Sequence, residues 1–305
     1  MKLQTFLFLF FCACPLFADC VSGSSVPEEG LVAYYPFDGD AVSRGSVAGV
    51  DGEVYRATLA TDRFGKSNSA YRFGGSDSAY IEIPDNDIFS IATTGALTVS
   101  AWISPDSLDF ERTDGGYVHW MGKGEPHAHE WALRMYNFRS ERPNRISSYA
   151  FNLSGGLGAG SYVQEEVVLG EWIHIVARYD MESNTITIFK NGAQKDQDPL
   201  YDDTYKVIPE NGNAPVRIGT RSLWSFFRGK IDDVRFYDRA VSDGEVLALY
   251  RECPDEATAL PSKKKSLGLR IRSGIVARGG KVCAVTGDSL DSGFSLNGQK
   301  GRCGR

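Results

Sequence analysis

Aspartates stand beside glycines at several points of the sequence, a pattern that can hold a metal ion or stabilise a turn. Asp38 and Asp40 flank one glycine after an apolar run, Asp232 follows Gly229, and Asp77 lies in a glycine-rich stretch. Hard cations such as Ca²⁺ bind carboxylate and backbone oxygens. Aspartates in turns instead accept hydrogen bonds from nearby backbone amides or pair with arginines. The residues alone leave both interpretations open.

Three of the four histidines lie close together in the sequence: His119, His127 and His129. Two histidines two positions apart on an extended segment point the same way and could share a metal with a neighbouring glutamate. The spacing fixes no third ligand, so a polar loop is the favoured interpretation. The fourth histidine, His174, is expected to be a strand residue with a hydrogen-bonded ring.

Aromatic side chains form a third group, because sugar rings stack on aromatic faces that have polar groups beside them. Four of them are candidates for ligand contact: Trp120, Tyr136, Tyr149 and Trp224. For each one, packing in the core is the competing interpretation. Three other tryptophans lie in expected strands and are assigned to the core or its border: Trp102, Trp131 and Trp172.

Short strands must position these side chains, because helical periodicity is almost absent before residue 240. Residues 97–103 alternate between apolar and polar, and residues 185–189 do the same before an Asn-Gly turn that is typical of a hairpin. Ser242 and Glu245 have the spacing of a capping box, which predicts one short helix. The chain is therefore predicted to be all-β, a two-sheet antiparallel sandwich with one short C-terminal helix.

Four stretches of the chain resemble the laminin-G-like branch of the concanavalin A-like lectin/glucanase superfamily. They are residues 30–40, 61–84, 170–192 and 229–250. The last contains Gly-Lys-Ile-Asp-Asp-Val-Arg-Phe-Tyr-Asp-Arg-Ala-Val-Ser and is the most specific of the four. The resemblance implies a jelly roll. It says less about function, because this fold hosts sugar binding, adhesion, protein recognition and hydrolysis.

The resemblance also bears on the aspartates. It implies that the first and last strands are neighbours and that a structural Ca²⁺ lies near their ends. Asp38, Asp40 and Asp232 are then the expected ligands. The segment rich in Asn and Gly that usually follows in such proteins is replaced here by residues 41–44, Ala-Val-Ser-Arg.

The sequence lacks the catalytic pattern of the laminarinase-like members, Glu-x-Asp-x-x-Glu, whose two carboxylates act about 5 Å apart on one strand face. The nearest acidic strands, at Glu82 and Glu165, do not match it. Polysaccharide-lyase motifs and the Gly-x-Ser-x-Gly elbow are missing too. We therefore expect no enzymatic activity. The alternative is a polysaccharide hydrolase or lyase with a non-standard site that uses Glu82 or Glu165.

The N-terminus is typical of an exported protein. Lys2 precedes an apolar run over residues 3–13 that is too short to span a bilayer, and together they predict a signal peptide over residues 1–18. The mature chain would be secreted, or held at the cell surface or in the periplasm. A lipoprotein anchor is the weaker alternative.

Four cysteines follow the signal peptide: Cys20, Cys253, Cys283 and Cys303. An even number suits an oxidising compartment, and three pairings are open. Pairing Cys20 with Cys253 and Cys283 with Cys303 keeps each bridge within one unit. We expect a jelly roll over residues 24–252, a linker over 253–265 and a small basic tail over 266–305.

The net charge of −6 is unevenly distributed. Residues 262–305 carry ten Lys or Arg against two Asp, or +8, which leaves −14 for the rest of the chain. An acidic body argues against a nucleic-acid partner, while the tail could contact an anionic surface. We expect an exported, non-catalytic recognition module that binds a glycan or an extracellular or cell-surface protein. A purely structural or adhesive surface protein is the other alternative.

Overall fold

The computed structural model describes residues 26–76, 78–110, 113 and 115–253, together with the backbone of four short strands beyond residue 274. The chain divides into two compact units, residues 1–258 and 259–305. Asp77, Cys20 and Cys303 lie outside the described residues.

The first sheet of the larger unit has eight antiparallel strands in the order β13-β12-β11-β6-β15-β4-β3, with β1 also paired to β15. The pairing of β1 with β15 makes the first and last strands neighbours. The strands are β1 (Leu31–Tyr35), β3 (Thr58–Ala60), β4 (Ala70–Gly74), β6 (Ala96–Pro105), β11 (Ile173–Asp180), β12 (Thr185–Lys190), β13 (Ala193–Pro199) and β15 (Arg228–Tyr237).

The second sheet has seven antiparallel strands in the order β10-β9-β8-β7-β14-β5-β2. They are β2 (Glu53–Tyr55), β5 (Tyr80–Ile83), β7 (Tyr117–Glu125), β8 (Ala128–Tyr136), β9 (Arg145–Ala150), β10 (Ala159–Gln164) and β14 (Val216–Ile218). Two antiparallel sheets confirm the predicted β-sandwich.

The main core lies between the two sheets. Alternate residues of β6, including Leu97 and Val99, are fully buried in it, as the period of two predicts. Trp131 of β8 is buried there too, and its indole N–H donates to the carbonyl of Phe89 at 2.8 Å. The 3₁₀ turn η1 (Asp87–Phe89) and the short helix α1 (Ile91–Thr94) precede β6 and were not predicted.

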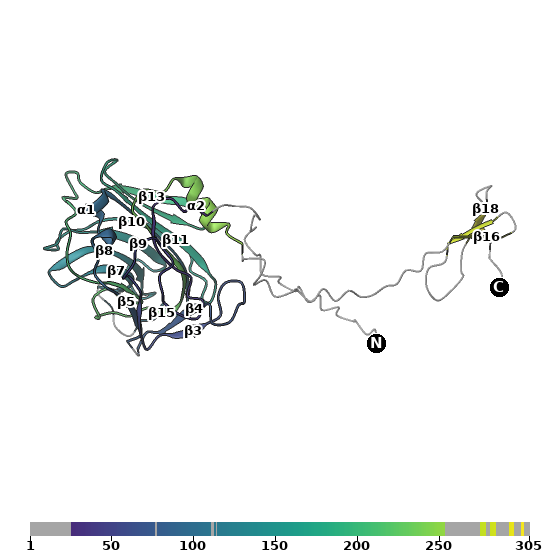
Figure 1. Ribbon diagram of the computed structural model, residues 1–305, viewed down its shortest axis with the longest axis horizontal. Helices are drawn as coiled ribbons and strands as arrows, with labels where there is room; N and C mark the ends of the chain where they lie inside the picture. The colour runs from purple at the N-terminus through teal and green to yellow at the C-terminus, as the bar shows by residue number, and fades with distance from the viewer. Residues whose placement is uncertain are drawn as a thin grey trace, which may run out of the picture. The chain divides into compact units, whose positions relative to one another are not determined.

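Helix α2 (Asp243–Tyr250) covers the outer face of the first sheet, beside β11 in Figure 1. The predicted capping box is confirmed, because Ser242 Oγ accepts from the Glu245 amide and the Glu245 carboxylate accepts from the Ser242 amide at 2.7 Å. Val246 and Leu249 pack on Val176 and the strands beside it in a second apolar cluster.

The smaller unit contains an antiparallel meander in the order β16-β17-β18-β19. Its strands are β16 (Ile275–Arg278), β17 (Lys281–Ala284), β18 (Gly293–Ser295) and β19 (Lys300–Gly301). In the part of the chain that the structure describes, no helix has the length and apolar character needed to span a bilayer.

Candidate functional site

The outer face of the second sheet collects side chains that the strand period turns away from the core. On β8, Leu133 and Met135 point into the core, so Arg134 and Tyr136 lie on the opposite face. Arg134 is paired across the sheet with His119 of β7 and with Ser147 of β9. Side chains two positions along from these partners are its diagonal neighbours, within reach of a long side chain.

These diagonal neighbours are aromatic. The guanidinium carbon of Arg134 lies over the ring of Tyr117 at 4.2 Å and over the ring of Tyr149 at 4.1 Å, with Phe151 at 5.2 Å. Two residues on from Ser147 is Tyr149, and two residues before His119 is Tyr117. The strand register of three adjacent strands therefore places one arginine among three aromatic rings.

Two glycines, one in β10 and one just before it, let two of these rings lie against the sheet. A Cβ at Gly160 would be 2.5 Å from the Tyr149 ring, and one at Gly158 would be 2.6 Å from the Phe151 ring. The rings therefore occupy the space above the backbone of the neighbouring strand. Any larger residue at these positions would displace them.

A pocket of about 640 Å³ opens over this group. The loops around residues 115–116, 139–142 and 156–158 form its walls. Its lining residues are Gly115, Gly116, Tyr117, Arg134, Tyr136, Arg139, Ser140, Glu141, Arg142, Tyr149, Phe151, Gly156, Leu157 and Gly158. A volume of this size lies within the range of small-molecule binding sites.

Arg134 is the most buried cation of the pocket, with 8% of its surface exposed. Its Nε has no hydrogen-bond partner, and none of the ion pairs found among the described residues includes it. Burial of an ionised group is unfavourable unless it is paired or hydrogen-bonded. The stacked rings compensate part of this cost through cation–π attraction.

The titratable neighbours of Arg134 are held in their neutral forms. Burial, followed by the charges of Arg221 and Arg134, lowers the pKa of His119 well below its usual value. Burial and the neighbouring Tyr136 raise the pKa of Tyr149 to about 12. At neutral pH a neutral imidazole therefore lies beneath the pocket, and the pocket holds the Tyr149 hydroxyl as a donor together with a fixed positive charge.

Two of the four predicted ligand-binding aromatics, Tyr136 and Tyr149, line this pocket together. Trp224 is 64% exposed between β14 and β15 and is not among the lining residues. The prediction for Trp120 needs correction, because its ring is fully buried in the core. A register shift between His119 and Met121 lets Trp120 and Met121, which are adjacent, both pack inward.

The aspartates predicted to bind calcium are not brought together around one point. Asp38 is exposed and pairs with the Lys66 ammonium at 2.7 Å. Asp40 is exposed and accepts from the Val42 amide at 3.1 Å. Asp232 is buried and faces the Arg63 guanidinium at 3.4 Å. Two of the three carboxylates already have a protein cation as partner, so the three do not fit a shared calcium site.

Asp232 belongs to a buried ion network on the outer face of the first sheet. Arg63 contacts Asp232, Asp233 and, at 3.2 Å, Glu252. Arg235 pairs with Glu252 at 2.7 Å. Burial acts to raise the pKa of Asp233, but Arg63 and Arg235 outweigh it and lower that pKa to about 2. The network joins β15 to the loop before β4 and to the end of α2, which is a structural role.

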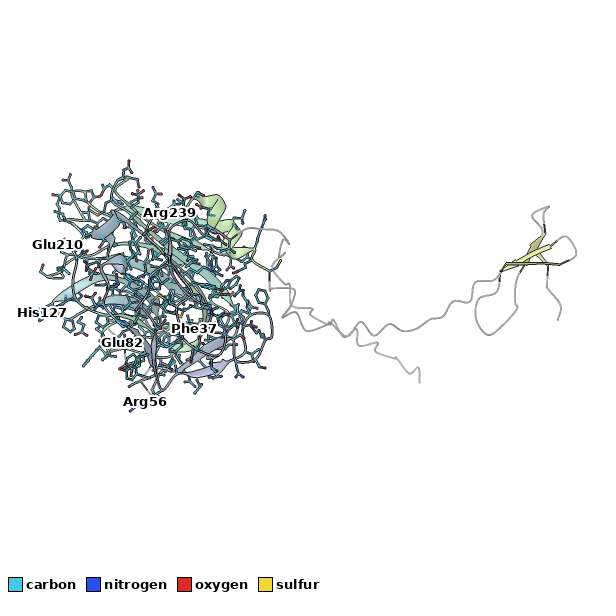
Figure 2. All side chains as sticks on the ribbon, viewed as in Figure 1. Phe37, Arg56, Glu82, His127, Glu210 and Arg239 are labelled. Atoms are coloured by element: carbon cyan, nitrogen blue, oxygen red, sulfur yellow. The ribbon has the colours of Figure 1, made fainter. Side chains whose placement is uncertain are left out.

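The histidines are also separated. His119 is buried on β7, and His127 is exposed at the turn between β7 and β8, at the edge of the unit in Figure 2. The His129 ring packs against Phe151, with 5.7 Å between ring centres. Over residues 26–253, apart from the gaps stated above, no group of three or more His, Cys, Asp or Glu is arranged to hold a metal. His174 is a buried residue of β11 whose Nε2 shares a hydrogen bond with Ser100 Oγ at 2.9 Å, with the Trp102 and Tyr250 rings beside it.

The two carboxylates considered for a hydrolase lie far apart. Glu82 is on β5 and pairs with Arg217 at 2.6 Å, while Glu165 follows β10 and pairs with Lys190 at 2.8 Å. Four strands separate β5 from β10 in the sheet. At about 4.8 Å per strand, β5 and β10 are roughly 24 Å apart, more than twice the separation of the two carboxylates in retaining or inverting glycosidases.

Sequence reasoning missed Arg134, Tyr117 and Phe151. The available signal was the alternation of β8, which places Arg134 on the same face as Tyr136.

Of the four cysteines expected to form disulfides, the structure describes the side chain of one. Cys253 is disulfide-bonded, and the other three cysteines have no described side chain. Their pairing stays a prediction.

A family model described as the concanavalin A-like lectin/glucanases superfamily matches residues 73–247, which is more than half of the chain. The chain belongs to this superfamily. The match includes β7, β8 and β9, the strands that carry the pocket, and confirms the resemblance found in the sequence. No curated protein sequence matches the chain.

Several solved structures of other proteins have the same fold as this chain. Domain 4 of AbnA, an extracellular GH43 arabinanase from Geobacillus stearothermophilus solved in complex with arabinotriose, is 19% identical with a TM-score of 0.54; the match covers 73% of this chain and all of that one. The botulinum neurotoxin serotype C1 binding domain is 10% identical with a TM-score of 0.54. There the match covers 74% of this chain and about half, 52%, of the toxin domain. At these identities the likeness establishes the fold only.

Proposed function

We propose that this superfamily member is a non-catalytic carbohydrate-binding module, with the sugar bound in the pocket over β7, β8 and β9. The observation that carries the proposal is the convergence of Tyr117, Tyr136, Tyr149 and Phe151 around a pocket of about 640 Å³ with a buried arginine in it. Aromatic faces with a few fixed polar groups are the usual composition of such sites. The arabinanase domain solved with arabinotriose supports the proposal by analogy of fold.

The pocket has the parts that a sugar needs. The partly exposed parts of the Tyr117 and Tyr149 rings can contact the C–H faces of a pyranose or furanose. The Leu157 side chain, 67% exposed at the rim, adds apolar surface. Phenol hydroxyls and guanidinium N–H groups can bind sugar hydroxyls. We expect affinities typical of modules that bind one or two sugar units in an open site, in the micromolar to millimolar range.

A glycan array with the mature protein tests the proposal. Tyr136→Ala and Tyr149→Ala are expected to lose the signals that the unaltered protein gives, because each removes a ring of the pocket. Tyr201→Ala is the matched control, since Tyr201 is half exposed beyond the end of β13 and is not a lining residue. Silence of the unaltered protein on all glycans would reject the proposal. Equal loss in the control variant would place the site elsewhere.

The non-catalytic part of the proposal rests on the separation of Glu82 from Glu165 and on their ion pairs with Arg217 and Lys190. Incubation with arabinan, mixed β-glucan and alginate should release no reducing ends and no unsaturated products. Release of either product by the unaltered protein, abolished in Glu82→Gln or Glu165→Gln, would overturn the non-catalytic part of the proposal in favour of a hydrolase or lyase.

Export is part of the same proposal, because a glycan-binding module acts on surfaces outside the cell. The N-terminal sequence of the protein recovered from its producing cells should begin at Asp19. Recovery of a chain that still begins at Met1 would contradict it. An extracellular protein as ligand would show instead as binding that survives enzymatic removal of glycans from that partner.

A further inference from the structure

A neutral sugar bound in the pocket would not neutralise the positive charge of Arg134. The residue is 8% exposed, its buried Nε has no hydrogen-bond partner, and none of the ion pairs among the described residues involves it. Sugar hydroxyls can accept a hydrogen bond from arginine, but they do not neutralise its charge. A buried cation is best satisfied by an anion with two acceptor oxygens.

Two other arginines near the pocket, Arg139 and Arg145, already have polar partners within the chain. Arg139 pairs with Asp109 at 3.1 Å. Arg145 donates from Nε at 3.2 Å and from an η-nitrogen at 2.8 Å to the side-chain oxygen of Gln164. Arg134 lies over the rings of Tyr117 at 4.2 Å and Tyr149 at 4.1 Å and, unlike Arg139 and Arg145, has no side-chain oxygen as partner among the described residues. The two rings fix the position of the guanidinium. Its N–H groups have no carboxylate partner in the described part of the chain.

The nearby groups favour an anion as well. The Arg134 charge is among the causes that keep the His119 imidazole neutral, so that ring adds no competing charge beneath the pocket. Arg139 and Arg142 add two more positive side chains to the wall, and Glu141 is the one acidic residue of the lining. The pocket thus has a positive balance within a chain of net charge −6.

We infer that the pocket selects glycans that carry a carboxylate, with Arg134 as the group that binds the carboxylate and Tyr149 as the ring that fixes its position. The inference rests on the proposed function, since it names the sugar class for the same site. The carboxylate can come from a uronic acid within a polysaccharide or from a terminal sialic acid. The chemistry at Arg134 is the same in both, a pair of N–H···O hydrogen bonds to one carboxylate.

Calorimetric titration with matched acids and esters tests the inference. The probes are trigalacturonic acid and 3′-sialyllactose, each compared with its own methyl ester, which keeps the sugar and removes the charge. One acid is expected to bind at least about tenfold more tightly than its ester, as for a charge-assisted pair in a buried site. The acid that does so identifies the source. This comparison needs no substitution, so it holds even where a variant fails to fold.

Variants assign the preference to Arg134. Arg134→Gln should lower the affinity for the acid by about tenfold or more and leave the affinity for the ester much less changed. Arg251→Gln is the matched control, because Arg251 is an exposed arginine at the end of α2, which packs on the other sheet. Thermal melting of each variant checks that it is folded.

The outcomes separate the two proposals. Acid and ester bound equally well by the unaltered protein would overturn the carboxylate inference and leave glycan binding standing. Binding of neither acid, ester nor neutral trisaccharide, together with a silent array, would overturn the proposed function. A preference for the acid that survives in Arg134→Gln would move the charged contact away from Arg134.

Discussion

The guanidinium carbon of Arg134 lies 4.1 Å from the centre of the Tyr149 ring. The ring is held there from behind, because Gly160 on the next strand leaves room for it where any Cβ would be 2.5 Å away. The position of the one buried charge in the pocket therefore depends on the absence of a side chain one strand further along. This chain of contacts gives the first prediction.

Gly160→Ala is expected to displace the Tyr149 ring and to weaken sugar binding about tenfold while the chain still folds. The loss corresponds to a cation–π and stacking contribution of about 1–2 kcal/mol. Gly244→Ala in α2 is the control, since its nearest neighbour atom is 4.0 Å away, and the change should leave binding unaltered while it stabilises the helix by about 0.5–1 kcal/mol. Titration with the best array ligand measures the first effect, and urea unfolding the second. Unchanged binding in Gly160→Ala would contradict the prediction.

The buried network around Asp233 predicts a large stability effect. Asp233→Asn removes the main ionic partner of Arg63 and the charged acceptor of the Tyr34 hydroxyl at 2.7 Å, and leaves part of the buried arginine charge uncompensated. We expect a loss of about 3 kcal/mol in the free energy of unfolding. Lys66→Met is the comparison, since its pair with Asp38 is partly exposed and should be worth less than about 1 kcal/mol. Denaturant unfolding of both variants gives the two values, and equal losses would argue against the network.

The buried histidines predict acid sensitivity. Burial, followed by the charges of Arg63 and Arg235, lowers the pKa of His174 from 6.5 to about 3. The unfolded chain therefore takes up a proton before the folded chain does, so the contribution of His174 is complete above pH 6.5 and is lost as the pH falls towards 3. Between pH 6.5 and 5 this amounts to about 1.5 kcal/mol.

Urea midpoints measured across pH 6.5–5 check this contribution, in a range where most carboxylates have not yet titrated. His174→Gln should reduce the slope of unfolding free energy against pH without abolishing it, because burial lowers the pKa of His119 as well. The same slope in the unaltered protein and in His174→Gln would show that His174 is not the source.

Calcium is expected to have little effect on the thermal midpoint. Arg63 and Lys66 already neutralise two of the three carboxylates that the sequence suggested as ligands. Scanning calorimetry of the larger unit within the full chain, with calcium and with a chelator, measures the difference. A midpoint raised by calcium in the unaltered protein and not in Asp38→Asn would restore the calcium site expected from the sequence.

The sequence by itself was enough to predict the β-sandwich, because the features that indicate its strands, turn and helix are short-range. Alternation over residues 97–103, the Asn-Gly turn at 191–192 and the capping box at Ser242 are each encoded within a few neighbouring residues. The neighbouring positions of β1 and β15 followed from the family resemblance. These features do not depend on which strands pair elsewhere in the sheet.

The site was decided by tertiary structure, because it depends on register between strands far apart in sequence. Arg134 meets Tyr149 only because β8 pairs with β9 in one register, and a shift by one residue would turn Tyr149 into the core. Trp120 was misassigned for the same reason, since a bulge in β7 sets which residues face inward. Arg63 could not be recognised as the partner of Asp232 and Asp233 either, as 169 positions separate it from the first of them. The sequence identified some of the candidate side chains, and the pairing of strands decided which side chains lie together in the site.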